Sequence, residues 1–243
     1  MLIRSYILLA GLLLPCTFVA AQSQPDPIDI YRKAAERVSA ATAISFHVEK
    51  RFDVVLIDGA KVEYSGALDA FASSTGGFFL DYGDDLSSRQ AWYDGKEMTL
   101  LDPIKNMYAM TPASGSNAEA LIQVGEEHGL EMPLAPLLKR KLADDLEALG
   151  DASYLGIHDA EGEACHHLLF RGESKDLQVW ISTGEQAVLR KMVVTFWDIE
   201  GAPQQALTFS EWNLEAEIAD DVFEAKIPED ALLIDFLSVR GEK

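Results

Sequence analysis

The chain has 243 residues, 48% of them hydrophobic, and carries 40 acidic against 20 basic side chains, a formal net charge of −20. A field of that sign repels nucleic acid and excludes it as a partner, so partners should be neutral, cationic or apolar, or should meet a local basic patch. The length and the ordinary apolar fraction suit one domain with a single hydrophobic core.

The N-terminus has the pattern of a secretory signal peptide. Arg4 precedes an apolar run over residues 6–14, and the small residues that signal peptidase needs follow at 19–21. The apolar run is too short to span a bilayer, which takes about 20 residues, so we expect no transmembrane segment. We expect cleavage between Ala21 and Gln22 and release of the mature protein into the periplasm.

The two cysteines have different expected fates. Cys16 lies in the leader and follows Pro15, where lipidation signals have a small residue, so a lipid anchor there is not expected. Cys165 is then alone in the mature chain and can form no internal disulfide. The fold must therefore depend on its apolar core.

The first predicted elements are a helix and an antiparallel meander. Asp26 and Pro27 form an N-cap followed by proline at the first helical position, which predicts a helix over 27–42. Alternating apolar residues over 44–57, followed by the turn signal Asp58-Gly59, predict a hairpin. Further strands are predicted at 61–71, 77–82, 88–93, 96–102 and 106–110.

The middle of the chain changes to helical periodicity. Ser116 is a suitable N-cap for a helix over 117–128. A second helix is predicted over 134–148, where leucines that include Leu138 and Leu142 form a stripe along one face.

The second half returns to strands, with tryptophans inside an alternating apolar and polar pattern. Strands are predicted at 152–159, 163–171, 177–182, 188–198 and 204–214. The count of about eleven strands and three helices, in runs that do not alternate, predicts an α+β architecture.

An ordered set of short segments carries a resemblance to a known family. These segments are 93–96 (YDGK), 102–103 (DP), 130–135 (LEMPLA), 165–170 (CHHLLF), 178–181 (QVWI), 190–191 (RK) and 210–214 (SEWNL). Their succession resembles the bacterial exported family known as domain of unknown function 2092 (DUF2092), over about residues 28–235. The family is in turn similar in fold to the Lol-type periplasmic lipoprotein carriers.

The resemblance implies an unclosed, curved antiparallel half-barrel whose concave face is covered by helices and receives acyl chains. We therefore expect a signal peptide over 1–21 and a single domain of this kind over 22–243. An apolar cavity on the concave face would take an acyl chain, since each buried methylene contributes about 0.8 kcal/mol. The candidate lining residues are Phe46, Phe78, Trp92, Leu138, Leu142, Trp180, Phe196 and Phe209.

The expected function is binding of a lipid, an acyl chain or a lipoprotein by a monomeric periplasmic protein. The alternative is an envelope interaction or sensor scaffold with the same fold, a closed dry core, and an envelope protein as its partner. In that alternative the aromatic residues are ordinary core. No cofactor is expected under either hypothesis.

The alternative of a hydrolase or metal enzyme depends on Cys165, His166 and His167, with His158 one strand earlier. Cysteine and histidine ligate zinc, and a thiolate beside an imidazole is a nucleophile. In a strand, however, Cys165 and His167 face one way and His166 the other, so the three cannot converge on one ion. We predict no catalytic residue and no metal site.

Overall fold

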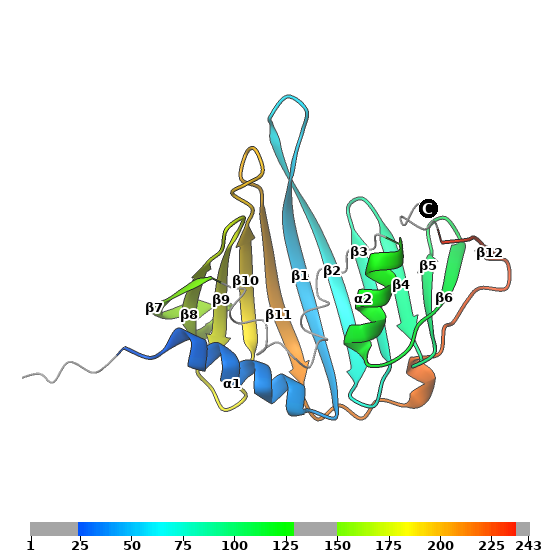
Figure 1. The fold of residues 1–243 in the computed structure, drawn as a ribbon, viewed down its shortest axis with the longest axis horizontal. Coiled ribbons are helices and arrows are strands. Elements are labelled where there is room, and N and C mark those ends of the chain that lie inside the picture. The colour runs from blue at the N-terminus through cyan, green and yellow to red at the C-terminus, as the bar shows by residue number, and fades with distance from the viewer. Residues whose placement is uncertain (1–23, 129–149, 237–243) are drawn as a thin grey trace, which may run out of the picture.

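One curved, unclosed antiparallel sheet organises the protein (Figure 1). The structure is a computed structural model that describes residues 24–128 and 150–236. The order of its strands is β12-β6-β5-β4-β3-β2-β1-β11-β10-β9-β8-β7. Their bounds are β1 Ala43–Val55, β2 Lys61–Ser73, β3 Phe78–Asp84, β4 Ser88–Tyr93, β5 Glu97–Asp102, β6 Met107–Pro112, β7 Asp151–Ala160, β8 Glu163–Arg171, β9 Asp176–Ser182, β10 Leu189–Thr195, β11 Gln204–Asn213 and β12 Leu232–Leu233.

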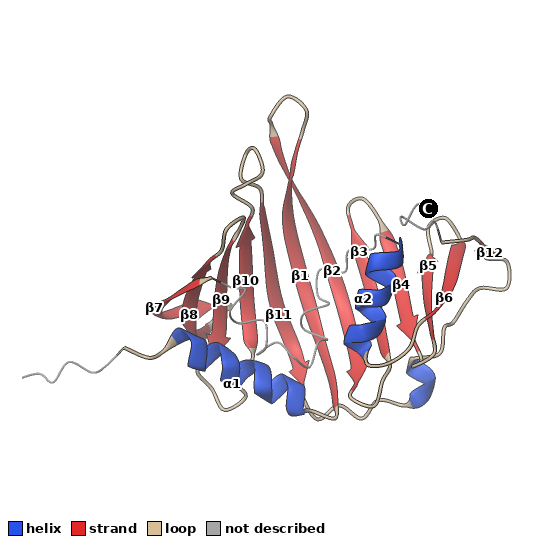
Figure 2. Cartoon of the chain, in the orientation of Figure 1, coloured by secondary structure: helices blue, strands red, loops and turns tan. Residues whose placement is uncertain are grey.

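Helix α1, Pro27–Ala40, crosses the lower ends of strands β9 to β11 on the concave face (Figure 2). Its start is fixed as predicted, because the Asp26 carboxylate accepts a hydrogen bond from the Ile28 amide at 2.9 Å. The side chains that it buries against the sheet are small: Ala34, Ala35 and Val38.

Helix α2, Asn117–His128, packs over β2 to β4 through three buried residues, Ala120, Leu121 and Val124. Its N-terminus is a capping box. The Glu119 carboxylate accepts from the Ser116 amide at 2.7 Å, and the Glu119 amide donates to the Ser116 hydroxyl at 3.3 Å. Ser116 therefore caps this helix as the sequence predicts.

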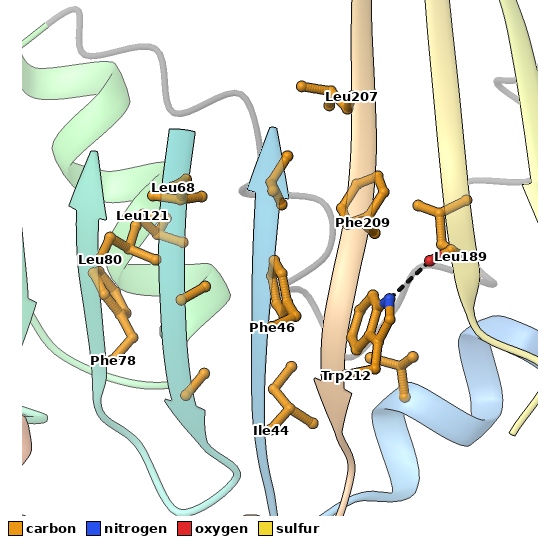
Figure 3. Packing of buried hydrophobic residues seen from close by; sticks show 14 of the residues in the cluster. Ile44, Phe46, Leu68, Phe78, Leu80, Leu121, Leu189, Leu207, Phe209 and Trp212 are labelled. Atoms are coloured by element: carbon orange, nitrogen blue, oxygen red, sulfur yellow. Dashed lines mark hydrogen bonds between the residues drawn. The ribbon is translucent and has the colours of Figure 1, made fainter. Parts of the chain in front are cut away.

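The core lies on the concave face, where α1 and α2 meet the sheet. Along β1 it takes alternate residues, Ile44, Phe46 and Val48, as period-two burial requires. Figure 3 shows the corresponding side chains of the neighbouring strands on the same side. Trp212 of β11 packs on Phe46 with ring centroids 4.5 Å apart, and its indole nitrogen donates to the Leu189 carbonyl at 2.7 Å.

The α+β half-barrel class is confirmed, with two differences in detail. Within the described residues twelve strands form in place of about eleven, because Leu232–Leu233 pairs in parallel with β6. The strand predicted over 188–198 ends at Thr195, and Phe196 opens the turn instead, with its amide donating to the Pro203 carbonyl at 3.0 Å. The helix predicted over 134–148 lies outside the described residues.

Candidate functional site

A small apolar pocket lies between α1 and the concave face of the sheet. Its volume is about 30 Å³. Because α1 meets the sheet through alanines, its side chains do not fill the space above the strands. The pocket is lined by Tyr31, Ala34, Ala35 and Val38 of α1 and by Ile181, Leu189 and Trp212 of the sheet.

Three of the predicted cavity residues lie on this face, within the packed core. Phe46 is 3% exposed, and Phe78 and Phe209 are fully buried. They come from three different strands, β1, β3 and β11. Phe46 and Phe209 are neighbours, with ring centroids 6.1 Å apart. Phe46 and Phe209 form a floor next to the pocket, since both rings pack on Trp212 of its wall. Phe78 lies farther away, on β3, and its ring contacts Tyr93.

Two other predicted residues lie on the convex face. Tyr93 of β4 faces the core, so Trp92 beside it faces away and stacks on Phe79 at 5.2 Å. By the same alternation Trp180 points away from the core, and its ring stacks on His167 at 3.9 Å. Trp92 and Trp180 therefore line no cavity on the concave face.

Phe196, the one remaining predicted residue that the structure describes, does not line the pocket. Phe196 is half-buried just beyond the end of β10 and is not a member of the core cluster. Leu138 and Leu142 lie outside the described residues.

Trp212 lines the pocket although the alternating pattern of β11 predicts that its side chain points away from it. Leu207 and Phe209 of β11 face the core, so strict alternation would point Glu211 inward and Trp212 outward. The backbone of Glu211 instead has φ = 53°, and the pairing with β1 shifts register at this point. This β-bulge turns Trp212 into the pocket.

Cys165 and His167 lie on the convex face, where His167 packs with His158, whereas His166 lies on the concave face beside Tyr154. His158 Nδ1 and His167 Nδ1 are 2.8 Å apart, and His167 Nε2 lies 3.2 Å from the Gln178 amide oxygen. Burial lowers the pKa of His167, which favours the neutral imidazole. In residues 24–128 and 150–236, no group of three or more His, Cys, Asp or Glu side chains is arranged to hold a metal ion.

Cys165 should be unreactive in the folded protein. Burial raises the pKa of its thiol to about 11, and the nearby Glu163 carboxylate acts in the same direction. The reactive thiolate is therefore scarce at pH 8.5, where an ordinary cysteine is about half ionised. We expect iodoacetamide at pH 8.5 to label native protein at least tenfold more slowly than protein unfolded in urea. Equal rates in the two states would contradict a buried, protonated thiol.

The fold defines a class of protein, an unclosed antiparallel half-barrel with helices on its concave face. The chain belongs to the family described as predicted periplasmic protein (DUF2092), which matches residues 28–237. The resemblance found in the sequence and the periplasmic location are thereby confirmed. In the described part of the chain, no helix is long and apolar enough to cross a membrane.

Several solved structures are similar to this chain at low sequence identity, and the first two below share its fold. An uncharacterized conserved protein from Thermus thermophilus has a TM-score of 0.51 at 12% identity, covering 84% of this chain and 98% of its own. LprF from Mycobacterium bovis has a TM-score of 0.50 at 13% identity, covering 86% and 98%. A LolA superfamily protein, NE2245 from Nitrosomonas europaea, has a TM-score of 0.37 at 10% identity, covering 83% and 99%. No curated protein matches the chain.

Proposed function

We propose that this periplasmic protein binds the apolar chain of a lipid, or of a lipid-modified partner, between α1 and the concave face of the sheet. The observation that carries the proposal is the apolar pocket under α1, which adjoins the aromatic floor of Phe46 and Phe209. Burial of each methylene in such a site contributes about 0.8 kcal/mol.

The pocket as it stands is smaller than the chain that it is proposed to take. Its 30 Å³ compares with roughly 300–1,000 Å³ for typical ligand pockets. Binding therefore requires α1 to move away from the sheet. The small contact side chains Ala34 and Ala35 lower the cost of that movement, because alanines bury less apolar area than leucines.

The same small volume supports a second candidate, an envelope interaction or sensor scaffold with a closed core. Phe46, Phe78 and Phe209 are packed as core residues, each 3% exposed or less. In such a scaffold α1 stays closed on the sheet, and the function resides in a protein partner bound elsewhere on the surface.

Titration with N-phenylnaphthylamine, an uncharged apolar fluorophore, separates these candidates. We expect saturable binding to the wild type and about tenfold weaker binding to Ala34→Leu, because the added side chain fills space worth roughly two methylenes. Ala40→Leu makes the same addition at an exposed position of α1 and should bind as the wild type does. Absence of saturable binding to folded wild type would reject the lipid-binding proposal and leave the scaffold.

A further inference from the structure

Lys50 is a half-buried cation on the apolar concave face, and no carboxylate in the described part of the chain forms an ion pair with it. It follows Val48 along β1 with regular pairing to both neighbouring strands, so its side chain lies on the same face as the core residues. Among the described residues Lys50 makes no ion pair, whereas Lys61, Lys105 and Arg190 pair with carboxylates at 2.9–3.1 Å. In a chain with 40 acidic and 20 basic residues, an unpaired half-buried lysine is unexpected.

The contacts of Lys50 are weak and leave much of its ammonium group available. Its nitrogen lies 3.4 Å from the Tyr82 hydroxyl, which is long for a hydrogen bond. It also lies over the Phe52 ring at 4.3 Å and the Tyr82 ring at 5.5 Å. An ammonium group has three N–H donors, and the two aromatic rings do not accept hydrogen bonds from them as carboxylate or phosphate oxygens do.

Asp84 is the acidic group whose charge acts on Lys50, and both of its carboxylate oxygens already accept hydrogen bonds. One oxygen accepts from the Tyr82 hydroxyl, and the other accepts from the Leu86 and Ser87 amides at 2.8 and 2.6 Å. Burial lowers the pKa of Lys50, and the Asp84 charge opposes that shift. Asp84 thus helps to keep Lys50 protonated without pairing with it directly.

Strand β2 lies between Lys50 and Asp84, and it has a glycine at the position paired with both residues. Gly66 of β2 lies opposite Lys50 on one side and Asp84 on the other. A Cβ at Gly66 would lie 2.6 Å from the Asp84 Cβ and 2.6 Å from the Gly83 carbonyl oxygen. The absent side chain leaves a clear path for Lys50 to reach across β2 toward Tyr82.

The distance between Lys50 and the pocket is one that an alkyl chain can span. Phe46, whose ring packs on Trp212 of the pocket wall, precedes it by four residues on β1. At about 3.3 Å per residue these positions are roughly 13 Å apart along the strand. Val48 and Leu207 provide an apolar surface over that interval. An alkyl chain of ordinary fatty-acid length spans such a distance.

We propose that Lys50 anchors an acidic headgroup, a carboxylate or a phosphate, of the amphiphile whose tail the concave face holds. This inference rests on the proposed function. The overall negative charge of the protein disfavours acidic ligands in general, so selection for one must come from this local site. The apolar tail and the headgroup would then be recognised by different residues.

Displacement of bound N-phenylnaphthylamine by matched ligands tests the headgroup separately from the tail. Dodecanoic acid and dodecyl phosphate should compete more strongly than dodecanol by roughly ten- to hundredfold, as expected for a charge-assisted hydrogen bond. Lys50→Met should lose the preference for acidic ligands but bind dodecanol as tightly as the wild type does. Lys50→Arg should retain most of the preference for acidic ligands. Lys61→Met, which removes a lysine that already pairs with Asp53, should behave as wild type.

The outcomes separate this inference from the function on which it rests. Equal competition by acid and alcohol in the wild type, or a preference that survives in Lys50→Met, would overturn the headgroup site and leave apolar binding intact. Failure of every ligand and of the fluorophore to bind would overturn both. Inorganic phosphate should not bind at millimolar concentration, and Lys50-dependent binding of it in calorimetry would show a free-anion site instead.

Discussion

Replacing Phe209 with alanine should lower the free energy of unfolding by about 3–5 kcal/mol. The side chain is fully buried and packs between Phe46 and Trp212, with ring centroids 6.1 and 6.0 Å away. Removing the ring therefore loses its transfer free energy and leaves a cavity lined by other aromatic rings, which can collapse only in part. Urea denaturation followed by circular dichroism measures the loss.

Phe52→Ala is the matched control for this prediction. Phe52 lies on the same face of β1, farther along the strand than Phe46, and it is only half-buried. Its truncation should cost clearly less than that of Phe209, since less apolar area returns to water. Equal losses from the two variants would mean that Phe209 is not in a tightly packed core.

Replacing Asn117 with alanine should destabilise the protein by about 3 kcal/mol or more, since each buried group left unpaired costs about 1–3 kcal/mol. Asn117 is 7% exposed and joins the start of α2 to the β2–β3 turn. Its amide oxygen accepts from the Gly77 amide at 2.8 Å. Its nitrogen donates to the Ser73 and Gly77 carbonyls at 3.0 and 3.1 Å. Thermal unfolding measures the effect.

Two further variants identify the cause. Asn117→Asp keeps the acceptor for Gly77 but sets a carboxylate against two carbonyl oxygens, so it should be at least as destabilising as alanine. Gln123→Ala removes an amide from a partly exposed site of the same helix, where its bond to the Pro112 carbonyl is 3.3 Å long. That change should cost less than about 0.5 kcal/mol. A melting temperature for Asn117→Ala as high as that of Gln123→Ala would contradict the account of this junction.

The sequence predicted those parts of the fold that depend on local chemistry. The β1–β2 hairpin follows from Asp58-Gly59, where Gly59 has φ = 84° as the turn requires. The starts of α1 and α2 follow from Asp26 and Ser116, whose side chains accept the hydrogen bonds expected of N-caps. Capping and turn signals act within a few residues, so they can be recognised from the sequence without knowledge of the tertiary structure.

The candidate site was harder to predict, because it depends on which face of each strand turns inward. Trp180 lies between Val179 and Ile181 in β9, and all three side chains are apolar. The pattern alone therefore does not show which of them face the core. At Glu211 a bulge reverses the alternation and brings Trp212 into the pocket. The pairing of β12 with β6 joins segments far apart in the chain and involves two exposed leucines without periodicity.

The central claim is that the concave face holds an apolar chain in the cell. Native mass spectrometry of the protein purified from its own periplasm, under non-denaturing conditions without detergent, tests that claim most directly. The account predicts a population heavier than the apo chain by the mass of one lipid, released on collisional activation and depleted in Ala34→Leu but not in Ala40→Leu. The claim would be contradicted if the wild type showed only the mass of the apo chain and still bound no lipid after a lipid extract of the same cells was added back.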